Sequence, residues 1–405
     1  MKFLNTRLVL ISFIILMLLN EFTLVYLDKN PPLSEPALFK IRIFNLLIFL
    51  LPVYFVLIQN LYSFLRINIF LDRFIFFSNF ILKITFPTFI TIILFDIVLG
   101  LFGYGYDTHY RQENIERFPS PYDSFSGKPN SKSEYEGAPQ HNEFGFRGNF
   151  VKSDQLNLED ISIAFFGGST GYNGNPPISD LVSKKIQSKG LKSIPYNFSS
   201  TSSSHTQHLH RLLKFHNKFN FDIVIFYGGG NETLQYLDFD RRPGFPYNFF
   251  YRQELSPFLQ TILRYSSIVG EFDKHTGLIS GISEIKKNYS GLQWKVSIID
   301  KYWEDLESAN RLTQSMIKPN SCVSPIFISV LQPANSNFFL KKHKEMWNLL
   351  VSSSSKKNLD YHLDLSKLDK KMLFSDIIHI DQQSRLKISD AIVDFIFPII
   401  KNKCL

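Results

Sequence analysis

A serine, a histidine and an aspartate in this sequence have the types and the spacing that ester chemistry needs. Ser169 follows two glycines in residues 167–171 (GGSTG), and His379 comes three residues after Asp376 in residues 376–379 (DIIH). A serine hydroxyl is a weak nucleophile until a base takes its proton, and a free imidazole, with a pKa of about 6.5, suits that task. A carboxylate near the histidine can fix the tautomer of its ring. We therefore expect Ser169, His379 and Asp376 to act as the nucleophile, base and orienting acid of an acyl-transfer site.

Such a site also needs hydrogen-bond donors for the negative oxygen that develops on the attacked carbonyl. Asn231 follows three glycines in residues 228–231 and offers a neutral side-chain NH2 group. The backbone N–H groups of Ser169 and Ser202 are the other candidate donors. Each donor of this kind is typically worth about 3 kcal/mol in the transition state.

Each of these residues also has a structural alternative. Ser169 could cap a helix, Asn231 could be a turn residue, and Asp376 and His379 could form a surface pair. Arg147 and Glu232 are weaker candidates, which we expect to contact substrate. Arg147 could instead form a structural salt bridge, and Glu232 could orient a loop or cap a helix.

Three histidines invite a metal-binding interpretation, since His205, His208 and His210 lie within six residues of one another. No acidic or cysteine ligand is evident nearby in the sequence, so we expect a solvated helix start instead. The sequence predicts no metal and no cofactor.

The elements that must position these residues alternate between strands and helices. Each candidate catalytic or oxyanion residue follows a predicted strand or precedes the last predicted helix, and in a parallel sheet the site lies at the carboxyl ends of the strands. The pattern predicts an α/β fold, a flavodoxin-like three-layer sandwich with a five-stranded parallel sheet. Residues 232–320 are expected to form an insertion that shapes a substrate groove. The expected strands are 161–166, 194–198, 222–227, 326–331 and 361–365, and the expected helices are 178–188, 207–219, 337–353 and 383–399.

The N-terminal quarter of the chain has a different character. Three long apolar stretches, near residues 8–27, 43–65 and 80–103, are each long enough to cross a membrane as a helix. A cleaved signal peptide is the alternative for the first stretch, and a buried helical core is the alternative for all three. We expect a transmembrane region over 1–104, a linker over 105–140 and a catalytic domain over 141–405. An N-terminus inside the cell would place this domain outside the cytoplasm.

Composition limits the other classes of protein. The 405 residues include 41 Phe, and 44 Lys and Arg against 36 Asp and Glu give a net charge of +8. An apolar content of 44% excludes disorder from low hydrophobicity, and no nucleic-acid-binding motif is present. Two cysteines exclude a disulfide-dense scaffold. Whether Cys322 and Cys404 form a disulfide or remain two thiols stays open.

Four short segments that contain the candidate residues resemble, in their order along the chain, the sequence blocks of the SGNH hydrolases, the GDSL lipase/esterase superfamily. The resemblance covers about residues 140–400. The first block matches residues 167–170, the second 197–202 (NFSSTS), the third 229–231 and the fifth 376–379. The resemblance implies that Ser169 is the nucleophile, with Asn231 and the backbone at 202 as oxyanion donors. Two residues depart from the family pattern. Ser202 stands where the family has glycine, and Gly168 stands where the GDS form has aspartate.

A further segment, residues 142–147 (NEFGFR), resembles the N-x-x-G-F-R lead-in of membrane-linked bacterial members. Several of those are implicated in O-acylation or deacylation of cell-surface glycans. The resemblance implies a membrane-anchored serine esterase or O-acyltransferase that acts, through an acyl-enzyme on Ser169, on acyl esters of a cell-envelope or lipid-linked glycan.

Hydrolysis and transfer remain open alternatives, and transfer would imply a separate membrane protein as acyl donor. A different class is also open, namely a catalytically weak binding or assembly subunit of an envelope polysaccharide machine. The reason for this alternative is that Ser202 stands where the family has glycine. A transporter has little support, because three spans leave little room for a midplane site.

Overall fold

We describe a computed structural model of the chain. The described residues are 41–43, 45–46, 48–50, 88–89, 91–100, 102, 104–105, 118–120, 123–131, 140–238, 242, 262–263, 266–279, 287–288, 290–354 and 359–404. The predicted span 8–27 lies outside them, and the spans 43–65 and 80–103 are covered only in part. Among the residues that are described, no helix combines the length and the apolar character that a membrane crossing requires.

The chain divides into two compact units. One unit comprises Met1–Asn114 and Arg252–Ser280, and the other comprises Ile115–Tyr251 and Gly281–Leu405. The second unit contains all the candidate site residues.

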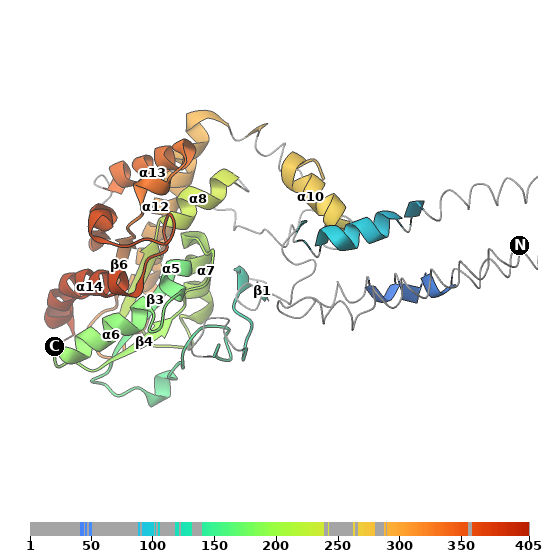
Figure 1. Ribbon diagram of the computed structural model, residues 1–405. Helices are drawn as coiled ribbons and strands as arrows, with labels where there is room; N and C mark the ends of the chain where they lie inside the picture. Colours follow the sequence, from blue (N-terminus) through green and yellow to red (C-terminus); the bar gives the residue numbers. More distant parts are fainter. Residues whose placement is uncertain are drawn as a thin grey trace, which may run out of the picture. The chain divides into compact units, whose positions relative to one another are not determined.

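The second unit is built on a five-stranded parallel sheet, as the sequence predicts (Figure 1). If the five strands are numbered by their order in the chain, their order across the sheet is 2-1-3-4-5. This is the flavodoxin-like order. Every residue of the first, third and fourth strands is buried, which explains why these strands read as continuous apolar runs. The strands are β3 (Ile161–Gly167), β4 (Ser193–Asn197), β5 (Ile223–Gly228), β6 (Ile326–Leu331) and β7 (His362–Asp364).

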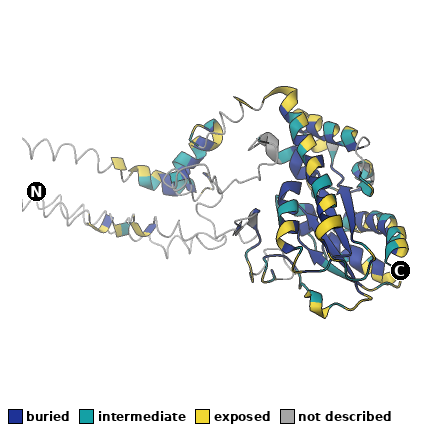
Figure 2. Cartoon of the chain, turned by 180° about the vertical axis from the view of Figure 1, so that it is seen from behind, coloured by how far each residue is buried: buried dark blue, intermediate teal, exposed yellow. Residues whose placement is uncertain are grey.

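Helices cover both faces of this sheet and enclose two apolar cores, drawn dark blue in Figure 2. Alternate residues of β3 point to opposite faces: Ala164 and Phe166 belong to one core, and Ile163 and Phe165 to the other. The first core is closed by α7 (His205–Phe215), α12 (Gly291–Met316) and α13 (Lys341–Ser354), and the second by α6 (Ile178–Ser188) and α14 (Gln382–Lys403).

Helix α12 belongs to the core of this unit, although its residues fall within the insertion expected over 232–320. Its residues Trp303, Leu306 and Ala309 are buried in the first core, at a spacing that places them on one helix face. Helix α8 (Gly230–Asp238) follows β5 in the same unit, whereas α10 (Ser267–Thr276) belongs to the other unit. What the sequence presents as one insertion is therefore divided between the two units.

Part of the linker expected over 105–140 has a regular structure. Strands β1 (Phe118–Ser120) and β2 (Ser124–Ser126) form an antiparallel pair. Between them, the buried Asp123 accepts a hydrogen bond from Arg211 Nε at 2.6 Å, and its carbonyl accepts one from Gln207 at 2.6 Å. These two contacts attach the hairpin to helix α7.

In the first unit, Asp96 lies within the helical residues 91–100 and caps α10. Its carboxylate accepts hydrogen bonds from Ser266 Oγ and Ile268 N, both at 2.8 Å. The first N–H groups of a helix have no partner inside it, and a carboxylate there is electrostatically favourable. Asp96 thus attaches the end of the third apolar stretch to the segment Arg252–Ser280 of the same unit.

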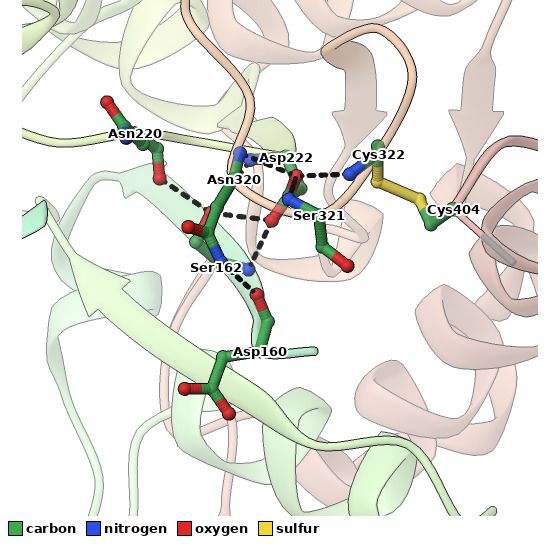
Figure 3. The surroundings of a disulfide bond; sticks show 8 residues. All are labelled: Asp160, Ser162, Asn220, Asp222, Asn320, Ser321, Cys322 and Cys404. Carbon is green, nitrogen blue, oxygen red and sulfur yellow. Dashed lines mark hydrogen bonds between the residues drawn. A yellow bond between two sulfur atoms is a disulfide. The ribbon is translucent and has the colours of Figure 1, made fainter. Parts of the chain in front are cut away.

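The amino end of the sheet is held by a buried carboxylate beside a disulfide (Figure 3). One oxygen of Asp222 accepts the N–H groups of Asn320, Ser321 and Cys322 at 2.9, 2.6 and 2.8 Å. The other oxygen accepts the backbone N–H and the hydroxyl of Ser162 at 2.8 and 2.9 Å. Cys322 is bonded to Cys404 at the end of α14, so the structure pairs the two cysteines whose state the sequence leaves open.

Candidate active site

Ser169 lies where β3 ends and a short helix, α5 (Ser169–Tyr172), begins. Gly168 is the residue between them, and a Cβ atom at that position would lie 2.3 Å from Nδ2 of Asn231. A side chain at 168 would therefore displace the Asn231 amide, which explains the glycine at this position. The backbone N–H of Ser169 is at the first helical position, where no acceptor exists within the helix.

His379 and Asp376 lie on a tight turn that precedes α14. One oxygen of Asp376 accepts the backbone N–H groups of Ile378 and His379 at 2.9 and 2.8 Å. The other oxygen lies 2.5 Å from Nδ1 of His379. Phe374 and Ile380 pair as an antiparallel bridge across the base of the turn. The turn thus orients the His379 ring with the carboxylate of Asp376.

The structure brings this pair to Ser169, since His379 Nε2 lies 2.7 Å from Ser169 Oγ. An ionised carboxylate only accepts hydrogen bonds, so Nδ1 of His379 carries the proton in this contact. In the neutral ring, Nε2 is then an acceptor and faces the serine hydroxyl. This arrangement has the tautomer that a general base for Ser169 requires.

The charge state of Asp376 follows from its contacts. Partial burial alone would raise the pKa of Asp376, but the hydrogen bonds from the backbone and ring of His379 and from the Ile378 N–H lower it. The side chains of His379 and Asp376 remain 30% and 52% exposed. Asp376 is therefore ionised at neutral pH, and the pair is open to solvent and to a ligand.

Of the other predicted oxyanion donors, Ser202 lies in the loop between β4 and α7, and Asn231 lies in the first turn of α8. Asn231 Nδ2 donates one hydrogen bond, to the Ser203 carbonyl at 2.7 Å, and its NH2 group has a second hydrogen. Because Nδ2 lies beside Gly168, the amide is adjacent to the nucleophile's turn. Ser202 has a φ of 60° and so adopts the left-handed conformation that glycine adopts most easily. The serine at this position therefore has a backbone shape that is more common for glycine.

The structure corrects the expectation that Arg147 contacts substrate. Its guanidinium is buried and donates to the carbonyls of Tyr172 and Gly174, the latter at 2.9 Å. It also lies over the Tyr172 ring, with Cζ 5.2 Å from the ring centroid. Arg147 therefore holds the chain just after α5 and offers no surface to a ligand.

Glu232 is likewise buried, which corrects its expected contact with substrate. Its carboxylate accepts hydrogen bonds from the backbone N–H and from Nδ1 of His205, at 2.6 and 2.7 Å, and from the Gly229 N–H at 3.0 Å. The prediction of a loop-orienting role matches these contacts better than a role in substrate binding.

The expected solvated helix start is also wrong, because His205 and His208 are buried. Burial lowers the pKa of His208 well below its ordinary value, so this ring is neutral. No group of three or more His, Cys, Asp or Glu side chains in the described ranges is arranged to hold a metal ion. The core positions His208, Leu212 and Phe215 follow a helical spacing, which is the signal that could have identified the buried face.

Two neighbours of the site carry no signal in the sequence. Gln332, directly after β6, accepts a hydrogen bond from Thr170 Oγ1 at 3.0 Å. His141 lies 2.6 Å from the Tyr172 hydroxyl through its Nε2 atom. Both contacts join residues more than 30 positions apart to helix α5, and no local pattern in the chain marks such contacts.

Comparison with known proteins gives the chain structural neighbours and no sequence relatives. No family model matches the chain, and no curated protein sequence matches it. Among solved structures, an acetyl xylan esterase is similar at 12% identity and a TM-score of 0.34, with 58% of this chain and 98% of that chain covered. A lipase/acylhydrolase from Enterococcus faecalis is similar at 15% identity and 0.31, with 58% and 95% covered. A carbohydrate acetylesterase family member from Sinorhizobium meliloti is similar at 11% and 0.32, with 60% and 97% covered. Similarities at this level carry no argument about activity.

Proposed function

We propose that this protein is a serine ester hydrolase or O-acyltransferase that works through an acyl-enzyme on Ser169. The observation that supports it most directly is the chain of contacts from Asp376 through His379 to Ser169, at 2.5 and 2.7 Å. A helix cap or a surface pair would not require an imidazole, in the accepting tautomer, at hydrogen-bond distance from a serine hydroxyl.

The proposed reaction has two halves: Ser169 first takes the acyl group from the ester, and an acceptor hydroxyl then takes it from Ser169. His379 Nε2 takes the proton of Ser169 Oγ as that oxygen attacks the ester carbonyl, and Asp376 stabilises the imidazolium. The Asn231 amide, with the N–H groups of Ser169 and Ser202, stabilises the oxyanion. The imidazolium then gives its proton to the departing alcohol, which leaves the acyl group on Ser169. In the second half, an acceptor hydroxyl loses its proton to His379 as its oxygen attacks the acyl carbonyl. The imidazolium then returns a proton to Ser169 Oγ as the bond between that oxygen and the acyl group breaks, which restores the free serine.

Water as the acceptor makes the protein an esterase, and a sugar hydroxyl makes it an O-acyltransferase. The exposed His379 and Asp376 side chains leave space beside the base for either acceptor. In the transferase form, we propose a separate membrane protein that delivers the acyl group, because the three spans expected from the sequence are too few to carry acyl groups across a bilayer unaided.

We further propose that the protein is anchored in the cell membrane by its N-terminal apolar stretches and that the unit carrying Ser169 lies outside the cytoplasm. The disulfide between Cys322 and Cys404 supports an oxidising compartment. The proposed substrate is an acyl ester of an envelope glycan or lipid-linked glycan. This part rests on the resemblance of residues 142–147 to the membrane-linked members and on the apolar N-terminal stretches.

The test compares the wild type with Ser169→Ala and with Ser188→Ala, a control at an exposed serine on α6. We expect Ser169→Ala to abolish turnover of a small acetyl ester and labelling by a fluorophosphonate, while Ser188→Ala retains both. Full turnover by folded Ser169→Ala would refute the mechanism. Product analysis with a glycan acceptor then separates the two reactions, since hydrolysis yields free acid and transfer yields acylated sugar.

The alternative of a catalytically weak binding subunit rests on Ser202 in place of glycine. The φ of 60° at Ser202 removes the reason to expect a distorted donor loop. A folded wild-type protein that neither reacts with a fluorophosphonate nor hydrolyses esters would nevertheless favour that alternative.

A further inference from the structure

A buried pair of side chains, Glu232 and His205, connects the two segments that carry candidate oxyanion donors. These donor loops are residues 199–205, which lead into α7, and residues 228–231, which lead into α8. Their side chains are 4% and 1% exposed. Glu232 stands next to Asn231 in the chain, and His205 follows residues 199–204, which include Ser202. The pair therefore joins two loops whose donors must converge on one carbonyl oxygen.

The contacts of Glu232 reach both loops. One carboxylate oxygen accepts the backbone N–H and the Nδ1–H of His205, at 2.6 and 2.7 Å. The other oxygen accepts the N–H of Gly229 at 3.0 Å. Hydrogen bonds to an ionised acceptor are stronger than neutral ones. A third link, from Asn231 Nδ2 to the Ser203 carbonyl at 2.7 Å, joins the same two loops on the side of the nucleophile.

Close packing fixes the position of the His205 ring. A Cβ atom on Gly228 would lie 2.3 Å from Cε1 of His205, so the ring lies directly against the backbone at the end of β5. On its other side, the ring of Tyr302 from α12 has its centroid 4.6 Å from that of His205. Next to His205, Thr206 donates to Asp305 of the same helix at 2.5 Å. Helix α12 thus packs against His205 and forms a hydrogen bond with the residue next to it.

The Glu232 carboxylate is ionised at neutral pH, although it is buried. Burial alone would raise the pKa of Glu232, but the charge and hydrogen bonds of His205 lower it, together with backbone hydrogen bonds. An ionised carboxylate can accept all three hydrogen bonds at once. A neutral amide in its place would turn one of its donors toward an N–H group and lose at least one of them.

From these contacts we propose that Glu232 and His205 are a positioning pair that fixes the two donor loops of the oxyanion site. Neither side chain touches substrate. The pair holds Ser202 in its left-handed conformation and the Asn231 amide beside Gly168, so that the donors are in place before charge develops. This inference rests on the proposed function for its catalytic consequence, but the fixing of the loops is a statement about the folded chain alone.

The first experiment measures amide hydrogen exchange in the full chain for the wild type, Glu232→Gln and Glu304→Gln. Glu304 is an exposed glutamate on α12 and is the matched control. We expect exchange in residues 199–205 and 228–231 to become at least about tenfold faster in Glu232→Gln and to be unchanged in Glu304→Gln. Unchanged exchange in both loops of Glu232→Gln would overturn the proposal, whether or not the protein is an enzyme.

The second experiment tests the catalytic consequence with an acetyl ester and with a boronic acid, whose tetrahedral adduct on serine imitates the oxyanion. For Glu232→Gln we expect kcat to fall about 10- to 100-fold, with KM within about threefold of the wild type and boronic acid affinity reduced in parallel with kcat. A raised KM with unchanged kcat would contradict a role in holding the oxyanion donors.

Two substitutions of His205 separate the hydrogen bond from simple packing. His205→Asn places an N–H donor near the position of Nδ1 and should retain most of kcat, whereas His205→Leu removes the donor and should behave as Glu232→Gln does. Equal loss in both variants would show that the hydrogen bond is not what matters. An inactive wild type with loosened loops in Glu232→Gln would refute the proposed function and leave the positioning pair standing.

Discussion

Replacement of Asp376 by asparagine should invert the tautomer of His379 without breaking the turn that carries it. In the structure, one oxygen of Asp376 accepts two backbone N–H groups, at 2.8 and 2.9 Å, and an asparagine oxygen can keep both. The amide nitrogen then replaces the oxygen that lies 2.5 Å from His379 Nδ1. Because that nitrogen is a donor, Nδ1 must become the acceptor and Nε2 must carry the proton. The ring would then donate to Ser169 Oγ and could not take its proton.

The size of the effect has two parts. Loss of a charge about 4 Å from the imidazolium is worth about 1–4 kcal/mol between the dielectric of water and that of a protein surface, and the half-exposed Asp376 belongs near the lower end. The wrong tautomer adds the cost of reaching the reactive one. Together we expect kcat to fall by about 10²- to 10⁴-fold, which corresponds to about 3–5 kcal/mol.

The assay compares initial rates on a small acetyl ester for the wild type, Asp376→Asn and Asp390→Asn. Asp390 is an exposed aspartate that binds Lys185, and its substitution should leave the rate unchanged. Asp376→Ala should lose the rate and also lower the melting temperature, because the turn then loses its two N–H contacts. A rate for Asp376→Asn within threefold of the wild type would refute the tautomer argument.

Three further predictions concern stability. Ser202→Gly should raise the free energy of unfolding by about 1 kcal/mol, because glycine adopts a φ of 60° without strain, and should leave kcat within about twofold; denaturant unfolding that finds a loss of stability would contradict this. Asp222→Asn should lower the free energy of unfolding by about 2–3 kcal/mol, because its amide nitrogen must face a buried N–H group, and a change below about 0.5 kcal/mol would show that the loop relaxes freely. Glu232 has a lowered pKa in the folded chain, so its stabilising contribution is complete above its unfolded pKa of about 4.3 and is lost as the pH falls through the folded value. Unfolding free energies measured between pH 5 and 3 should therefore fall more steeply for the wild type than for Glu232→Gln, and parallel curves would speak against the linkage.

The strands, and the proximity of Ser169, Asp376 and His379, could be predicted from the sequence because both leave local signals. Residues 223–227 of the expected strand 222–227 form a continuous apolar run, and the structure has β5 at Ile223–Gly228. Ser169 could be placed at the end of a strand because two glycines follow an apolar run there. Asp376 and His379 are only three residues apart, so their contact is nearly dictated by the turn.

The buried polar residues could not be predicted, because their partners lie far away in the chain. Glu232 and His205 are 27 residues apart, and each alone has the character of a surface residue. A charged side chain is buried only when a partner compensates the cost of desolvation, and no periodic pattern reports such a partner. The same reason explains why Arg147 was expected to contact substrate, although it binds carbonyl groups at Tyr172 and Gly174.

The hydrogen bond between His379 and Ser169 joins residues 210 positions apart, one just after β3 and the other just before the last helix, α14. During synthesis, Ser169 leaves the ribosome long before His379 does. A nascent or prematurely terminated chain therefore contains the serine but lacks the histidine that is proposed to activate it. Any ester-cleaving activity of this unit would be absent until the whole sheet has assembled. The moment at which activity appears would therefore report when folding is complete.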